Sequence, residues 1–153
     1  MIGRARRALG IGQPAGGDDA VGILVARWLQ DRVATDDVSI QEVSDPLQLI
    51  EGLAGIDQAV LVDAVVAEDE PGRIMQLQWD EIENHRTSSL SSHGIGVGTV
   101  VLLARRLNSP LPRDISVVGI VIKPPAVPTY EISEAVAAAI PKAGALVREI
   151  LDA

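Results

Sequence analysis

The chain has no cysteine and no phenylalanine, and aromatic residues make up only 2% of its 153 positions. The absence of cysteine excludes disulfides, thiolate metal sites and a cysteine nucleophile. Apolar residues still amount to 47% of the chain, so its core must be built from Val, Ile, Leu and Ala. A core of these residues is typical of a parallel sheet that is covered by helices. We therefore expect an α/β protein.

Positive charge and long apolar runs are also scarce. The 13 Lys and Arg residues are outnumbered by 21 Asp and Glu residues, which gives a net charge of -8 at pH 7. Affinity for nucleic acids comes from cations that neutralise phosphates, so this balance argues against a nucleic-acid partner. No segment approaches the ~20 consecutive apolar residues of a membrane span, and no apolar run of signal-peptide length follows the first ten residues. We predict a cytoplasmic protein with no membrane partner, and we interpret Arg4, Arg6 and Arg7 as a solvated N-terminal end.

Short β-branched runs alternate along the chain with longer segments of helical periodicity. The strands that this pattern predicts are 8–12, 38–43, 58–65, 72–79 (nearer a sheet edge) and 115–122. The helices that it predicts are 19–33, 44–55 (with a Ser or Asp N-cap), 97–107 and 130–151, the last kinked or interrupted by Pro141. The alternation indicates a single domain over residues 1–153, a three-layer α/β/α sandwich with a mainly parallel, twisted sheet. Such sheets bind ligands at the carboxyl ends of their strands.

A glycine-rich turn, GIGQPAGGDDAVG at residues 10–22, precedes the first predicted helix. Its two acids, Asp18 and Asp19, fall in the first helical turn, where an acid that caps free amides contributes ~0.3 to 1 kcal/mol. One acid is explained in this way, and the second is left to face a ligand. Such a turn repels a phosphate and attracts a cation. A nucleotide site is the weaker alternative, because Gly-x-Gly-x-x-x-Gly-Gly departs from the dinucleotide-binding pattern.

Asp63 lies in the apolar run AVLVDAV, inside or at the end of a predicted strand. A carboxylate among valines and leucines loses much of its hydration, at a cost of several kcal/mol unless it is paired or bound to a metal. This position indicates a functional acid. The alternative is a structural aspartate that caps a loop or meets an arginine at the end of the strand.

His93 stands in SSHG, where a long polar segment ends and a helix begins. The other histidine, His85, lies in a polar run that we interpret as solvated. The alternative for His93 is a helix-start histidine that bonds to nearby backbone. Ser91 and Ser92 are N-cap candidates, because no Gly-x-Ser-x-Gly elbow supports a serine nucleophile.

One acid of the turn, Asp63 and His93 would all project over one end of a doubly wound sheet. Two carboxylates and an imidazole form a mixed oxygen and nitrogen ligand set. Such a set suits a divalent ion such as nickel, zinc or cadmium and leaves positions open for water or substrate.

Together these segments resemble the hydrogenase maturation proteases, endopeptidases that trim the large subunit of nickel–iron hydrogenases. The resemblance rests on the glycine-rich turn with its acidic pair, on the strand LVDAV, on SSHG and on VVGI at residues 117–120. It spans nearly the whole chain, and the motifs occur in the family's order. The sequence departs from the family at Gln13, where an asparagine is usual, and at Ala20, where a glycine is common. The charged segment RARRALG also predicts a short first strand.

The resemblance implies a fold and an activity. The fold is an α/β/α sandwich, of the phosphorylase/hydrolase-like type. Asp19, Asp63 and His93 are then both the catalytic residues and the metal ligands. No metal is bound permanently, because the nickel is supplied by a hydrogenase large-subunit precursor, although the site can take cadmium or zinc. The activity is removal of the C-terminal extension of that nickel-loaded precursor. The alternative is a catalytically degenerate relative that acts as a metal- or partner-binding module.

Overall fold

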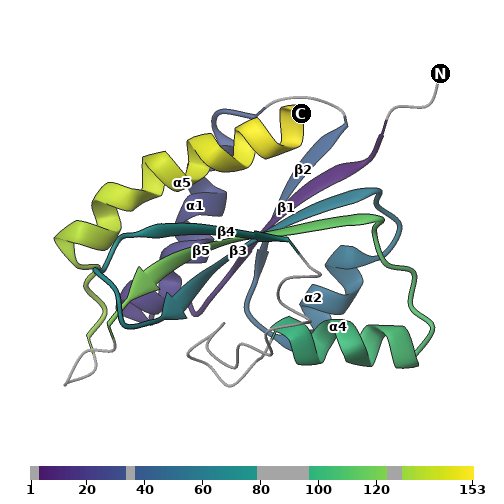
Figure 1. Cartoon of the computed structure of the whole chain (residues 1–153), viewed down its shortest axis with the longest axis horizontal. Coiled ribbons are helices and arrows are strands. Elements are labelled where there is room, and N and C mark those ends of the chain that lie inside the picture. Colours follow the sequence, from purple (N-terminus) through teal and green to yellow (C-terminus); the bar gives the residue numbers. More distant parts are fainter. Residues whose placement is uncertain (1–3, 34–36, 79–96, 124–128) are drawn as a thin grey trace.

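The computed structural model describes residues 4–33, 37–78, 97–123 and 129–153, which form a twisted sheet between two layers of helices (Figure 1). The strands are β1 (Arg6–Ile11), β2 (Val38–Val43), β3 (Gln58–Val66), β4 (Ile74–Gln78) and β5 (Asp114–Ile122). Their order in the sheet is β2-β1-β3-β5-β4. Four of the strands are parallel, and β4 is an antiparallel edge strand beside β5. The predicted α/β architecture with a mainly parallel sheet is confirmed.

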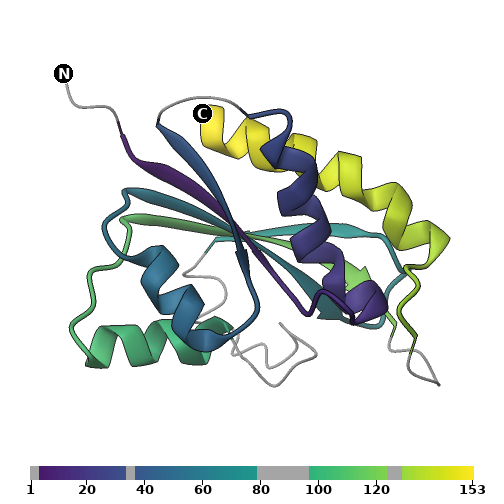
Figure 2. The same cartoon turned by 180° about the vertical axis from the view of Figure 1, so that it is seen from behind.

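Helices cover both faces of this sheet (Figures 1 and 2). They are the 3-10 helix η1 (Gly17–Ala20) and the α-helices α1 (Val21–Gln30), α2 (Pro46–Leu53), α4 (Val97–Arg106) and α5 (Glu134–Asp152). Helices α1 and α5 pack on one face, and α2 and α4 pack on the other. Within the described residues, no helix has the length and apolar character needed to cross a bilayer.

Strand β3 is the centre of the core because both of its faces are covered. Successive side chains of a strand point to opposite faces. Val60 and Val62 therefore pack under α1 and α5, whereas Leu61 and Val65 pack under α2 and α4. This double burial explains the nearly continuous apolar run of the strand.

The helix boundaries follow local chemistry, with two departures from the sequence prediction. Asp45 caps α2 as expected, since its carboxylate accepts a hydrogen bond from the Gln48 amide at 2.9 Å. The first helix is preceded by the separate 3-10 turn η1. Helix α5 runs through Pro141 without interruption. Pro141 is exposed, and the carbonyl that loses its helical partner, that of Ala137, lies one turn earlier on the same side, where water can reach it.

The N-terminal arginines are not merely a solvated end, and the first strand is longer than predicted. Arg6 and Arg7 are the first two residues of β1 and point to opposite faces. Arg6 donates to the carbonyl of Leu151 at the end of α5, and Arg7 donates to the carbonyl of Gly52 at the end of α2, at 2.9 Å. Helix ends carry unpaired carbonyls and partial negative charge, so each arginine stabilises the helix on its own face.

Candidate active site

The candidate site lies where β1 ends beside β3. The two strands pair only as far as Gly10 and Val62, so Asp63 is the first residue of β3 beyond that pairing. Its other neighbour, across the sheet, is Gly119 of β5. Asp63 is fully buried and alternates with Leu61 and Val65, which places it on the face that α2 and α4 cover. Asp63 thus lies inside β3, just beyond the point where β1 stops pairing with it.

Glycines of the turn allow the start of α1 to approach this point. A Cβ on Gly22 would lie 2.3 Å from the carbonyl oxygen of Ile11 and 2.4 Å from that of Val62, so no side chain fits there. Gly22 thus lets the helix start lie directly against the residue before Asp63. Gln13, the departure from the family's asparagine, donates to the Ser44 carbonyl at 3.2 Å and ties the turn to the segment after β2.

One carboxyl oxygen of Asp63 has no partner among the residues that the structure describes. Its Oδ1 accepts a hydrogen bond from the Ala64 amide at 2.8 Å, but its buried Oδ2 has no hydrogen bond there. No arginine pairs with Asp63 within the described ranges. An unsatisfied buried carboxyl oxygen costs free energy that a proton, a water or a cation can recover.

The electrostatic surroundings of Asp63 explain which form of the acid is present. Burial raises the pKa of Asp63 from 3.8 to about 8; the Ala64 amide opposes this rise, and the negative charge of Asp19 adds to it. The acid is therefore mostly protonated at neutral pH. A cation beside Asp19 and Asp63 would favour the ionised form and displace the proton.

The prediction that one acid of the turn caps the amides of its own helix is wrong for Asp18. Asp18 does not cap its own helix. Its carboxylate accepts hydrogen bonds from the amide and the hydroxyl of Ser133 at 2.7 and 2.8 Å. Ser133 is the N-cap residue of α5, so Asp18 fastens the start of that helix to η1. Asp19 is the acid whose charge acts on Asp63.

His93 lies outside the described residues, as do His85, Ser91 and Ser92. Within the described ranges, no three His, Cys, Asp or Glu side chains form a group that could hold a metal ion. The ligand set Asp19, Asp63 and His93 therefore stays a prediction. The chain enters α4 four residues after His93, and α4 packs on the face of the sheet that carries Asp63.

A comparison with family models identifies the family of the chain. Residues 23–150 match the model described as HycI, hydrogenase maturation protease. The chain belongs to the hydrogenase maturation protease family. The matched range contains Asp63 and His93 and begins just after Asp19. A comparison with curated proteins gives no match.

Solved structures of this family have the same fold. The hydrogenase maturating endopeptidase HybD from E. coli is 25% identical with a TM-score of 0.83, over 97% of this chain and 92% of that one. The [NiFe] hydrogenase maturation protease HycI from Thermococcus kodakarensis KOD1 is 26% identical with a TM-score of 0.70, over 97% and 93%. HybD from Thermococcus kodakarensis, at 23% identity and a TM-score of 0.74 over 95% and 98%, supports the fold alone. This maturation protease is therefore an endopeptidase that acts in hydrogenase maturation.

Two lysines, Lys123 and Lys142, belong to no motif of the sequence. Lys123 follows the last residue of β5, and Lys142 lies on α5. Each lines a cavity. The fold brings Lys123 to the same cavity as Asp18, which lies 105 residues earlier in the chain.

Proposed function

We propose that this protease removes the C-terminal extension of a nickel-loaded [NiFe] hydrogenase large-subunit precursor. The observation that carries the proposal is the buried carboxyl of Asp63, whose Oδ2 has no partner among the described residues and whose pKa the charge of Asp19 helps to raise. Membership of the maturation protease family supports a precursor of this kind as the substrate. We place the reaction in the cytoplasm, with no membrane or nucleic-acid partner.

In this proposal the metal belongs to the substrate and is not a resident cofactor. Asp19, Asp63 and the imidazole of His93 form a set of three ligands, which binds a free ion weakly but can share an ion that another protein already holds. Until a cation arrives, burial and the negative charge of Asp19 keep Asp63 mostly protonated. Recognition is therefore conditional on nickel having been inserted, although zinc or cadmium can occupy the same ligands.

The same residues support hydrolysis of a peptide bond. A water must lose a proton as it attacks the carbonyl, and a carboxylate whose pKa lies near the working pH is an efficient base for that step. The pKa of Asp63 is about 8 without a cation, and a bound cation would lower it and leave the carboxylate ionised and able to accept that proton. We propose an aspartic-type, metal-assisted reaction in which an oxygen of Asp19 or Asp63 that the ion does not use holds the attacking water.

The test is cleavage of the precursor, followed by mass spectrometry. The protease is mixed with the large-subunit precursor purified with nickel and, separately, without nickel. We expect loss of a C-terminal fragment only from the nickel-loaded form. Asp19→Asn, Asp63→Asn and His93→Gln should abolish the mass loss and keep the fold, whereas Asp31→Asn, at an exposed site after α1, should cleave normally.

The alternative function, a binding module without activity, gives a different result in the same experiment. The nickel-loaded precursor would then co-elute with the wild-type protein and keep its full mass. Normal cleavage by Asp63→Asn would contradict the proposed role of this acid.

A further inference from the structure

Helix α4 is apolar on the side that faces the sheet and also on the side that faces solvent. Its sheet side is formed by three buried residues, Val100, Val101 and Ala104. On the solvent side, Leu102 and Leu103 are 50% and 45% exposed, and Leu107, the first residue after the helix, is 63% exposed. A helix that is apolar all round is normally covered by protein on every side. The solvent side of α4 therefore has the composition of a surface that another molecule covers.

The exposed leucines of α4 lie together, with a cation among them. Residues three or four positions apart on a helix are neighbours on its surface. Arg106, which is exposed, comes three residues after Leu103 and four after Leu102. Leu107 comes four after Leu103, and its amide donates to the Leu103 carbonyl at 3.0 Å. The name α4 surface is used below for these four residues, Leu102, Leu103, Arg106 and Leu107.

The α4 surface lies on the layer of helices that covers the candidate site. Asp63 is on the face of the sheet that α2 and α4 cover, and α4 begins four residues after His93. Helix α2 lies beside α4 (Figures 1 and 2) and adds Leu47, which is 63% exposed, in its first turn. The chain just before α2 is tied to the glycine-rich turn through the hydrogen bond from Gln13 to the Ser44 carbonyl. A large protein that reaches Asp63 therefore comes up against this layer.

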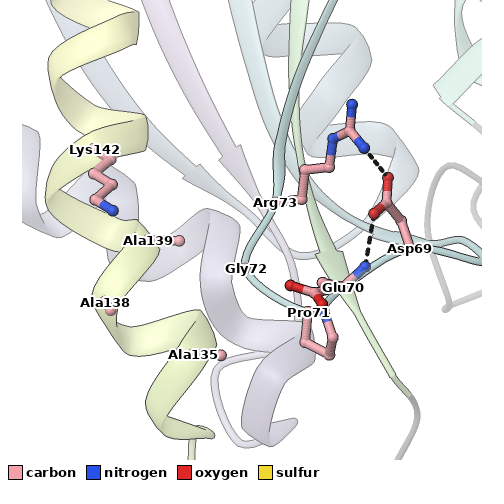
Figure 3. Close-up of a pocket in the computed structure, with 9 residues that line it drawn as sticks. All are labelled: Asp69, Glu70, Pro71, Gly72, Arg73, Ala135, Ala138, Ala139 and Lys142. Carbon is pink, nitrogen blue, oxygen red and sulfur yellow. Dashed lines mark hydrogen bonds and ion pairs between the residues drawn. The ribbon is translucent and has the colours of Figure 1, made fainter.

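The opposite layer has no surface of this kind. Within the described residues, no large hydrophobic side chain of α1 or α5 is exposed. Helix α5 presents Ala135, Ala138 and Lys142 to a cavity (Figure 3). The far wall of that cavity holds the ion pair of Arg73 and Asp69. Exposed leucines scattered singly need no explanation, but those of the described chain are all on α2, on α4 or directly after α4. This confinement indicates an interaction surface.

Charge favours a foreign protein over a second copy of this chain as the partner. In a two-fold dimer the same surface meets itself, which would bring two Arg106 guanidinium groups into one small interface. The net charge of -8 on each chain adds to the repulsion between copies. A partner that places apolar side chains on the leucines and an acidic side chain near Arg106 is complementary to the surface.

We propose that the α4 surface docks the body of the hydrogenase precursor, through an apolar patch of the precursor that carries an acidic residue. This inference rests on the proposed function. The contact is made with a part of the precursor that does not react, so it is the same before and during cleavage. Loss of such a contact raises KM and leaves kcat unchanged.

Steady-state cleavage of nickel-loaded precursor tests the docking surface. The double variant Leu102→Ser, Leu103→Ser should keep the fold, because both side chains are exposed, and should raise KM about tenfold with kcat nearly unchanged. Arg106→Glu should raise KM by about 3- to 10-fold at low salt and by less at high salt, whereas Arg106→Lys should stay close to wild type. The matched controls, which should keep the wild-type KM, are Tyr130→Ser, at an exposed aromatic residue outside α2 and α4, and Arg148→Glu, at an exposed cation on α5.

Binding of precursor purified without nickel gives a readout that does not depend on catalysis. Under the proposed function this form is not cleaved, but it still carries the docking patch. We expect it to bind the double variant about tenfold more weakly than wild type. If the double variant binds more weakly but wild type cleaves no precursor at all, the docking surface stands and the proposed function fails.

Three results would overturn the inference and leave the proposed function intact. The first is an unchanged KM in the double variant. The second is an equal rise of KM in Tyr130→Ser. The third is a wild-type dimer, measured by light scattering, that the double variant dissociates, because the α4 surface would then join two copies of this chain.

Discussion

At the scale of single residues, the molecule is most unusual at Asp63, an acid held in an apolar strand with one oxygen unpartnered among the described residues. Its position could be predicted from the sequence, because an acid within AVLVDAV has few ways to remain hydrated. The neighbours of Asp63 could not be predicted from the sequence. Asp19, whose negative charge helps to raise the pKa of Asp63, lies 44 residues away along the chain. The partner of Asp18 was equally hidden, because Ser133 lies 115 residues away.

The raised pKa of Asp63 makes stability depend on pH. Below 3.8 the acid is protonated in both states; between 3.8 and about 8 the folded state must take up a proton that the unfolded state lacks. The free energy of unfolding therefore falls as pH rises through this window, by of order 1 kcal/mol per pH unit from this group. Asp63→Asn should remove that contribution and be more stable than wild type near pH 8.

Urea unfolding at several pH values between about 5.5 and 8 measures this effect as the difference between wild type and variant. Asp31→Asn, at an exposed acid, should follow the wild-type pH profile. If the difference in free energy of unfolding between wild type and Asp63→Asn stays constant with pH, the raised pKa of Asp63 is wrong.

The hydrogen bonds between Asp18 and Ser133 should stabilise the fold about as much as a typical helix cap does. Asp18→Ala removes both hydrogen bonds to Ser133 and should lower the free energy of unfolding by about 1 to 2 kcal/mol. Ser133→Ala removes only the hydroxyl bond and should cost less. Urea denaturation of both variants and of the double variant measures the coupling, and strictly additive losses would contradict a direct contact.

At the scale of elements, strands and helices were predictable where periodicity and caps coincide. Asp45 followed by Pro46 predicted the start of α2, and the continuous apolar run predicted β3. Contacts to distant backbone were not predictable, because a carbonyl carries no sequence signal. The sequence therefore does not predict the contacts of Arg6 and Arg7, whose partners are the carbonyls of Leu151 and Gly52.

The contact between α1 and the sheet should be intolerant of any side chain at Gly22. Replacing a helical glycine by alanine ordinarily stabilises by up to ~1 kcal/mol. Gly22→Ala should instead destabilise by about 1 to 3 kcal/mol, because the new Cβ meets the rigid carbonyls of Ile11 and Val62. It should also lower cleavage activity, since the start of α1 positions Asp19.

Gly52→Ala provides a comparison within the other helical layer. Its new Cβ would lie 2.4 Å from the tip of the Leu9 side chain, which can rotate away. Thermal unfolding should therefore show a smaller loss for Gly52→Ala than for Gly22→Ala. The reverse order would contradict the close approach of α1 to β1 and β3.

At the scale of the whole molecule, the fold brings together parts of the chain that no local pattern connects. The alternation of strands and helices predicted the layers, but the neighbour order β2-β1-β3-β5-β4 and the reversed direction of β4 follow from packing. That order puts Asp63 between the end of β1 and Gly119 of β5. The cavities along α5 arise in the same way, from loops that follow different strands.

A site assembled from distant segments should couple metal binding to proton release. Zinc added to the protein without precursor should bind weakly and raise the melting temperature, because it stabilises only the folded state. The affinity should rise by about tenfold per pH unit between about pH 6 and 7.5, since the ion displaces the proton of Asp63. Asp63→Asn and His93→Gln should lose the shift, and Asp31→Asn should keep it. A melting shift that persists in Asp63→Asn would mean that the ion binds elsewhere, and that the two acids and the histidine do not form one site.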